Sequence, residues 1–338
     1  MTTQSKEELA KNETLARLFE LIEKGKPLPW QADWTTSKGM GGLPYNHNSG
    51  RAYTGGNMIT LLIAQMALGW KSSAFVTYNG AIRDGGNVIK GEKAKVAVRL
   101  ATPVKDKSGE QVYNEDGTEK MYYGYFPLFN VEQCEGLSIA PPVVEKPVEW
   151  RHAMAEKLLA DSGVTILHDG GDRAYYSRND DSVHLPFKSQ FKTASGYYAT
   201  AAHEIGHASM APHRLNREVK GKMGSKDYAF EELRAEIFSM IVGSSIGLFR
   251  DPEYDPANHA AYVQHYLELF KEEPDALFRA AADAQKIATY YNVEAYAHEP
   301  CGPEYDASTA VKPSTARKSS KTRTRTPKPK QEHALQAA

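Results

Sequence analysis

YYATAAHEIGH, residues 197–207, contains the pattern H-E-x-x-H in a run whose other residues are typical of a helix. The four-residue spacing places His203 and His207 on one helix face, one turn apart, so both imidazoles can reach one metal ion. Glu204 then lies beside the open coordination position, where a carboxylate can take a proton from water. The flanking residues are small or apolar, as expected for a buried helix. The stretch therefore predicts a peptidase-type metal site; the alternative is a helix with two histidines and an exposed glutamate.

Two segments compete to supply a third ligand, since catalytic zinc usually has three protein ligands. His213 completes the metzincin spacing, but that pattern requires a glycine where Met210 stands. Residues 228–247, YAFEELRAEIFSMIVGSSIG, have a helical pattern with two acids one turn apart, Glu232 and Glu236. One carboxylate can bind the metal, Zn²⁺ or another divalent ion such as Mn²⁺, while the other accepts a histidine ring N–H. Following the order in gluzincins, we expect Glu232 as the ligand and Glu236 as the outer partner; the reverse assignment stays open.

The N-terminal third of the chain combines glycine, aromatic and basic residues. Residues 39–57, GMGGLPYNHNSGRAYTGGN, follow a proline-rich approach with two tryptophans, and eight basic residues stand against two acidic ones over residues 38–99. Cations can follow phosphates while bases stack on rings, so the pattern favours binding of unpaired nucleic acid. The alternatives are an ordinary surface loop and aromatic strands that belong to a core. The candidate DNA contacts are Trp30, Trp34, Tyr45, Arg51, Tyr53, Asn57, Lys90, Lys93 and Lys95.

The expected elements divide the chain into two α+β parts. A helix over residues 5–24 and several short strands predict a small domain over residues 1–136, in which DKSGE and NEDGTE form hairpin turns. Residues 137–149 contain three prolines and are typical of a linker. Residues 150–305 form a mainly helical domain with a short sheet. Its strand Ser182–Leu185 is expected at the sheet edge, where it can align a peptide substrate.

Charge separates the body of the chain from its end. Between Lys312 and Lys330 lie eight basic residues and no acidic ones, whereas the remaining 33 basic and 42 acidic residues give the body a net charge of −9. The same stretch is rich in Pro, Ser and Thr, so residues 306–338 are predicted to be disordered. The tail is either a solvated extension or a basic arm attracted to phosphates.

The sequence favours a cytoplasmic protein without a membrane partner. Its N-terminus lacks the basic-then-apolar layout of a signal peptide, and no long apolar run occurs. Cys134 and Cys301 lie far apart and outside any C-x-x-C pair. They are expected to be unpaired thiols in a reducing compartment, with one disulfide as the alternative.

Two sets of motifs, in order, resemble the ArdC-like antirestriction proteins of conjugative plasmids. The N-terminal set is PLPW, LPYNHNSGRAYTGGN with MITLL, and NVIKGEKAKVAV. The C-terminal set is LPFKSQFKTASGYYATAAHEIGHASMAPHRLNRE with YAFEELRAEI, and together they span about residues 25 to 245. The chain departs from the family at residues 210–212, Met-Ala-Pro, where relatives often carry Thr-Gly.

The resemblance implies an N-terminal domain that binds single-stranded DNA and a C-terminal zincin-like metallopeptidase domain of a bacterial protein. It also implies protection of incoming plasmid DNA from host restriction enzymes. The metal domain is then either a peptidase or a structural metal fold. A third hypothesis is a DNA-stimulated protease, whose targets are restriction enzymes or other proteins bound to DNA.

Overall fold

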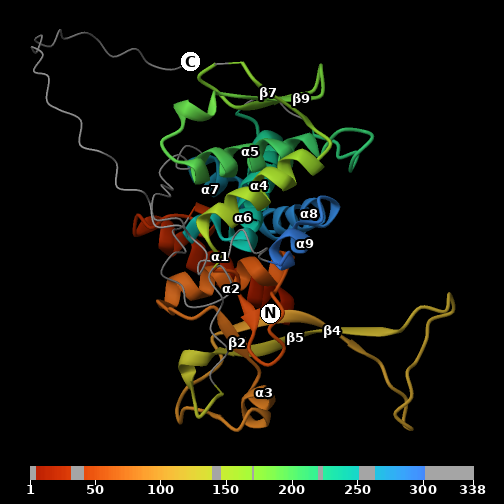
Figure 1. Cartoon of the computed structure of the whole chain (residues 1–338). Coiled ribbons are helices and arrows are strands. Elements are labelled where there is room, and N and C mark those ends of the chain that lie inside the picture. Colours follow the sequence, from red (N-terminus) through yellow and green to blue (C-terminus); the bar gives the residue numbers. More distant parts are fainter. Residues whose placement is uncertain are drawn as a thin grey trace, which may run out of the picture.

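The structure is a computed structural model that describes residues 5–31, 42–138, 146–169, 171–219, 224–250 and 263–300. Helices and several small sheets make up these residues (Figure 1), which confirms the predicted mixed α+β class. Within the described ranges, no helix is both long and apolar enough to cross a membrane. The predictions for Trp34, Cys301 and the basic tail lie outside the described residues, and Cys134 is a free thiol.

The N-terminal part begins with a helix whose bounds agree with the predicted range, residues 5–24, to within one residue at each end. Ser5 accepts a hydrogen bond from the Glu8 backbone while the Glu8 carboxylate accepts one from the Ser5 backbone, so a capping box starts α1. Leu15, Leu18 and Leu21 bury one face of this helix. The elements of this part are α1 (Lys6–Glu23), η1 (Pro29–Gln31), β1 (Tyr45–Asn46), α2 (Gly55–Leu68), β2 (Ala74–Val76), α3 (Tyr78–Arg83), β3 (Asn87–Val88), β4 (Val96–Pro103), β5 (Met121–Asn130), η2 (Val131–Gln133) and β6 (Cys134–Glu135).

A four-stranded sheet in the order β1-β2-β5-β4 organises this part. The pair β1 and β2 is parallel and the other pairs are antiparallel, while β3 and β6 form a separate antiparallel pair. The β4–β5 ribbon extends away from the rest of the protein (Figure 1). Between the two strands, backbone hydrogen bonds close turns from Gly109 to Asp106 and from Gly117 to Asn114, which confirms the two hairpin turns predicted there.

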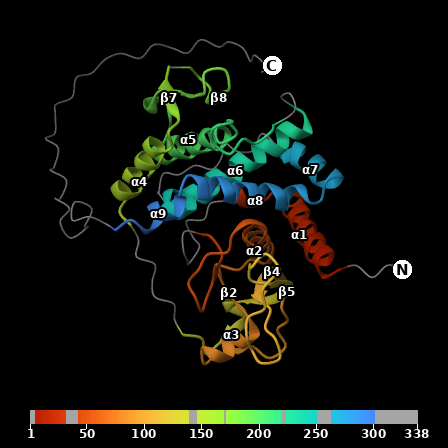
Figure 2. The same ribbon diagram turned by 90° about the vertical axis from the view of Figure 1, so that its right-hand side faces the viewer.

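The C-terminal part packs a small sheet above a set of helices (Figure 2). Its elements are α4 (Val148–Asp161), β7 (Thr165–His168), β8 (Tyr175–Ser177), β9 (Ser182–Leu185), η3 (Lys188–Gln190), α5 (Ala194–Ala208), α6 (Lys226–Ile246), η4 (Leu248–Arg250), α7 (Val263–Glu272), α8 (Ala276–Tyr290) and α9 (Val293–His298).

One prediction about this sheet is wrong. The strand β9, expected at the edge, is the central strand, because β7 pairs with it in parallel on one side and β8 pairs with it antiparallel on the other. Its backbone groups are therefore used within the sheet and are not available to align a substrate. Among the described strands of this sheet, β7 and β8 hold the edges.

The apolar interior runs without interruption from the N-terminal part into the C-terminal part. Leu18 and Ile63 belong to the same buried cluster as Ile237 and Ala281. The two parts meet closely where α2 lies on α8: a Cβ added at Gly55 would lie 3.7 Å from the Cα of Ala282. The division into domains at residues 136 and 150 stays a prediction, and the shared interior fixes how the two parts meet.

Candidate metal centre

Two helices with small residues at their contact position the candidate ligands. A Cβ added at Gly206 of α5 would lie 2.9 Å from Cδ1 of Phe238 and 3.3 Å from the Cα of Ala235, both on α6. A side chain at that position would force the helices apart. The glycine of the H-E-x-x-H stretch therefore allows α6 to approach, and this brings Glu232 opposite His203 and His207.

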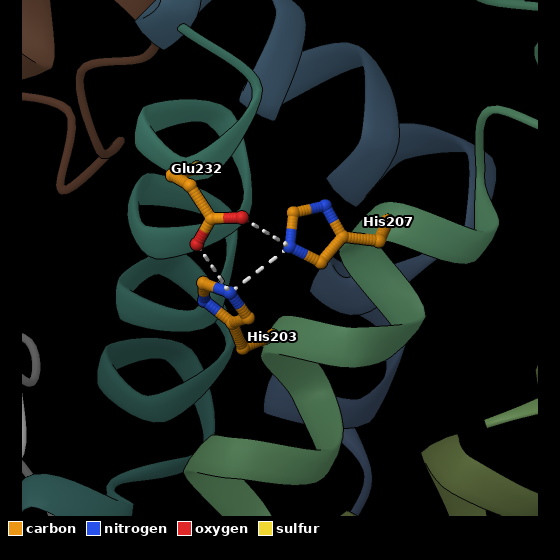
Figure 3. Close-up of side chains that lie close together, drawn as sticks. All are labelled: His203, His207 and Glu232. Carbon is orange, nitrogen blue, oxygen red and sulfur yellow. Dashed lines mark hydrogen bonds and ion pairs between the residues drawn. The ribbon is translucent and has the colours of Figure 1, made fainter. Parts of the chain in front are cut away.

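The three side chains converge on one point between α5 and α6 (Figure 3). The Nε2 atoms of His203 and His207 are 3.1 Å apart. Oε2 of Glu232 is 3.5 Å from Nε2 of His203, and Oε1 of Glu232 is 3.4 Å from Nε2 of His207. A tetrahedral ion with bonds of about 2.0–2.1 Å holds its ligand atoms roughly 3.3 Å apart. The spacing of these donor atoms fits such an ion, and within the described residues no other such cluster occurs.

The competing ligand does not join this cluster. The side chain of His213 is 61% exposed, and its Nε2 lies 3.3 Å from Oδ2 of Asp181. Asp181 also accepts two hydrogen bonds, of 2.6 and 3.0 Å, from the guanidinium of Arg214. These contacts tie the segment after α5 to the turn between β8 and β9. In this fold His213 belongs to that surface network and not to the metal cluster.

Glu231, which the sequence analysis did not single out, is an outer partner of His207. Its Oε1 lies 3.1 Å from Nδ1 of His207, the ring nitrogen that faces away from the cluster. Glu236 is buried one turn further along α6, where its charge acts on His203. Glu231 is therefore the outer partner of His207, and the expectation that Glu236 is the outer partner of a histidine ligand stays a prediction.

Two arginines hold Glu231 in place. Arg217 donates to both of its carboxylate oxygens, at 2.6 and 2.9 Å, and Arg234 donates to Oε2 at 3.2 Å. Glu231 is 2% exposed, so its carboxylate needs these partners to remain charged. The sequence carried one signal, the Arg-Leu-x-Arg run that ends at Arg217. Periodicity alone does not say which acid that arginine meets.

The charges around the cluster raise the pKa of both histidines and lower the pKa of Glu231 and Glu232. Burial acts to lower the pKa of both histidines. The hydrogen bond to Glu232 raises the pKa of His203, and hydrogen bonds to Glu231 and Glu232 raise that of His207 well above its ordinary value. Although burial opposes it, hydrogen bonds from His207 and Arg217 lower the pKa of Glu231 to about 2. Loading the site with metal therefore releases protons, and metal affinity rises with pH.

Glu204 lies beside the cluster rather than in it. The side chain is buried, and its negative charge contributes to the raised pKa of both histidines. Three donors, a divalent ion and a nearby carboxylate are the parts that hydrolysis of an amide requires.

The residues proposed to contact DNA fall into two groups. The rings of Trp30, Tyr45 and Tyr53 are buried, at 3%, 8% and 8% exposure. Trp30 packs edge-on against Tyr266 of α7, at 5.9 Å between ring centroids. The expectation that these three rings are open for stacking is corrected, because the core of the fold takes up their apolar faces. The four cations in the set are exposed: Arg51, Lys90, Lys93 and Lys95.

Asn57 has a structural role that the sequence did not indicate. Its side-chain amide donates to the Arg99 carbonyl at 2.7 Å and accepts from the Arg99 N–H at 2.9 Å. The start of α2 is thereby fixed to strand β4.

Comparison with known proteins connects both parts of the chain to one family. Residues 9–129 match the N-terminal domain of the anti-restriction factor ArdC, and residues 153–283 match a zincin-like metallopeptidase. The crystal structure of the Mn(II)-bound antirestriction ArdC protein from the R388 plasmid is 30% identical, with 85% of this chain and 98% of that chain covered and a TM-score of 0.62. The chain belongs to the ArdC family. The metal-free structure of the R388 protein is similar to the same degree, with 31% identity and a TM-score of 0.61.

Other relatives of this ArdC-family chain include longer proteins. Two proteins named DNA primase TraC from Escherichia coli are 39% identical over 288 residues, but the chain spans only 26% and 19% of their lengths. An uncharacterized protein, y4eC, from Sinorhizobium fredii (strain NBRC 101917 / NGR234) is 32% identical, and the matched region covers 82% of this chain and 90% of that protein. A zincin-like domain implies a divalent metal, and the cluster of His203, His207 and Glu232 has the donor types and spacing to hold one.

Proposed function

We propose that this ArdC-family chain binds single-stranded DNA without sequence preference and protects incoming plasmid DNA from host restriction enzymes in the bacterial cytoplasm. The observation that carries the proposal is the likeness to the R388 antirestriction protein, which extends over 85% of the chain and over both of its parts. The exposed cations of the N-terminal part support the DNA component, because they can follow a phosphate backbone.

The C-terminal part would hold a divalent ion, Zn²⁺ or Mn²⁺, through His203, His207 and Glu232. Such an ion polarises a carbonyl group and lowers the pKa of water. Glu231 would fix the ring of His207, since it accepts the hydrogen bond from the nitrogen that is not used for the metal. Glu204 would take the proton of the attacking water and deliver it to the leaving amine. Its burial beside the cluster supports this assignment, because the carboxylate is shielded there from bulk water.

A second candidate function is a DNA-stimulated metalloprotease that cleaves proteins bound to DNA. It is supported by the presence of a peptidase-type cluster and a candidate DNA surface in one chain with a shared interior. The two candidates differ in whether proton transfer by Glu204 is needed.

The test is plasmid transfer into a restricting host that carries the unchanged chain, Glu204→Gln or His203→Ala. If the chain protects DNA only by binding to it and shielding it, Glu204→Gln protects as well as the unchanged chain. Loss of protection with Glu204→Gln, with metal content and fold retained, favours the protease. In the test tube, cleavage of restriction enzymes would be followed with and without single-stranded DNA. An unchanged chain that neither binds single strands nor protects the plasmid would refute the proposed function.

A further inference from the structure

A groove outside the metal centre lies where the N-terminal part meets α8. Its volume is about 520 Å³, and its walls come from α1, the start of α2, strands β4 and β5, and α8. Figure 2 shows α8 above α2, with α1 beside α2 and strands β4 and β5 below it. Pockets of this size commonly accept a small molecule or one unit of a polymer.

One wall of the groove is the face of the β4–β5 ribbon that does not enter the core. Arg99 is paired in register with Tyr125, and Ala101 with Tyr123, so these four residues share one face of the ribbon. The guanidinium of Arg99 lies 4.9 Å from the ring centroid of Tyr123. The ring of Tyr123 is 56% exposed. The wall therefore offers an open aromatic face with a cation beside it.

The backbone of Arg99 is held by the side chain of Asn57, and among the described residues no acidic side chain pairs with its guanidinium. Asn57 makes the two hydrogen bonds described above to the peptide groups of Arg99. The other cations at the groove are already paired: Lys11 lies 2.9 Å from Glu7 and 2.8 Å from Asp275, and Arg279 bonds to Glu273. Within the part of the chain that the structure describes, Arg99 forms no ion pair, so its charge is available to a ligand.

The opposite wall is apolar and close. Phe278 of α8 lines the groove, and a Cβ added at Gly56 would lie 3.6 Å from its Cδ1. Alanines at positions 10, 97, 101 and 282 also line the groove, together with the polar side chains of Glu7, Thr54, Thr60 and Asp275. A slot with one apolar wall, one exposed ring and one available cation suits a planar base with a phosphate attached to it.

We propose that this groove binds one nucleotide unit of single-stranded DNA, with the base stacked on Tyr123 and its phosphate at Arg99. The proposal rests on the single-strand binding proposed above and specifies where one part of the strand lies. Stacking is indifferent to the identity of the base, since every base has a π-face, and this agrees with binding without sequence preference.

The experiment measures the affinity of the full chain for a fluorescent 15-mer of dT over a range of salt concentrations. Tyr123→Leu should weaken binding roughly 5- to 100-fold, the range found when a stacking side chain is removed. Tyr123→Phe keeps the ring and should bind like the unchanged chain. The matched control is Tyr122→Leu. Tyr122 is 61% exposed, but it projects from the opposite face of the same strand to Tyr123.

The charge is tested separately. Arg99→Gln should weaken binding and reduce the slope of log affinity against log salt by about 0.7, the value for one phosphate contact on a single strand. Lys107→Gln, an exposed cation in the distal part of the ribbon, is the control and should leave the slope unchanged. Thermal unfolding of each variant establishes that the fold is retained.

The outcomes separate this inference from the function on which it rests. An unchanged chain that does not bind the 15-mer refutes the proposed function and the groove with it. An unchanged chain that binds, with Tyr123→Leu and Arg99→Gln binding equally well, overturns the groove alone. Competition with dTMP distinguishes the source of the nucleotide: if dTMP binds as tightly as the 15-mer, the groove is a site for a free nucleotide and the strand proposal is wrong.

Discussion

Replacing Glu231 by glutamine tests whether Glu231 is the outer partner of His207. Glutamine has nearly the same shape and can still accept from Nδ1 of His207, but it lacks the negative charge that Arg217 and Arg234 hold in place. The ring of His207 then loses a charged acceptor at 3.1 Å. Two partly buried guanidinium groups also lose their shared anion, next to the candidate metal site.

The expected size of the effect follows from these contacts. Loss of an outer hydrogen-bond partner typically weakens metal binding about 10- to 100-fold, which corresponds to roughly 1.4–2.7 kcal/mol. Removing one member of a buried ion pair costs about 3–5 kcal/mol of folding stability. Glu231→Gln should therefore lose both metal affinity and stability. The double variant with Arg217→Gln should recover part of the stability, because one unpaired cation is gone, while metal binding stays weak.

The assay is competition for Zn²⁺ between the metal-free chain and a chromogenic chelator, with thermal unfolding recorded on the same samples. Glu236→Gln is the matched control, since it removes a buried glutamate from the same helix. We expect it to change zinc affinity less than Glu231→Gln does. A larger loss for Glu236→Gln, or an unchanged affinity for Glu231→Gln in a folded protein, would refute the assignment of Glu231.

Three further predictions test the fold and the site. Chelation of the metal should lower the unfolding temperature, because an ion present at 100 times its dissociation constant stabilises the folded state by about 2.7 kcal/mol; scanning fluorimetry with and without EDTA measures this. Gly206→Ala should cost about 1–3 kcal/mol in urea unfolding, since the added methyl would lie 2.9 Å from Phe238. A hydrogen bond to Asp169 raises the pKa of His184 above 6.5. Its stabilising contribution is therefore full below about pH 6.5 and is lost as the pH rises through the raised pKa. In an NMR titration, Asp169→Asn should bring the pKa of His184 back down.

Features that depend only on local residue spacing could be predicted from the sequence. The histidines of H-E-x-x-H are one turn apart on any helix, so their convergence needed no knowledge of the fold. A second helix with two acids one turn apart offered Glu232 and Glu236 as the third donor, in competition with His213. Which acid of α6 reaches Nδ1 of His207 depends on how α5 crosses α6, where the close contact at Gly206 brings the two helices together. Periodicity carries no information about that crossing.

Predictions that depended on exposure or on strand order were less successful, for a related reason. Trp30 and Tyr53 are as compatible with a stacking platform as with a core, and only their partners decide. Trp30 meets Tyr266, more than 200 positions later in the sequence. The central position of β9 likewise depends on β7 passing to its far side. The groove combines parts of five elements, from α1 at residue 7 to α8 at residue 282, so the sequence of no single element predicts it.

Helix α8 connects the two regions that the proposals concern. On its N-terminal turns, Phe278 and Arg279 line the groove. Arg279 also lies 5.0 Å from the ring of Phe230, whose ring is 3.9 Å from the guanidinium of Arg234. Arg234 in turn donates to Glu231, the partner of His207, and to Asp283 of α8. A DNA-stimulated activity requires energetic coupling between the groove and the metal cluster, and these packed side chains form one contiguous route between the two. Because contiguity alone does not establish energetic coupling, the zinc affinity measured with and without the 15-mer decides whether the route transmits anything.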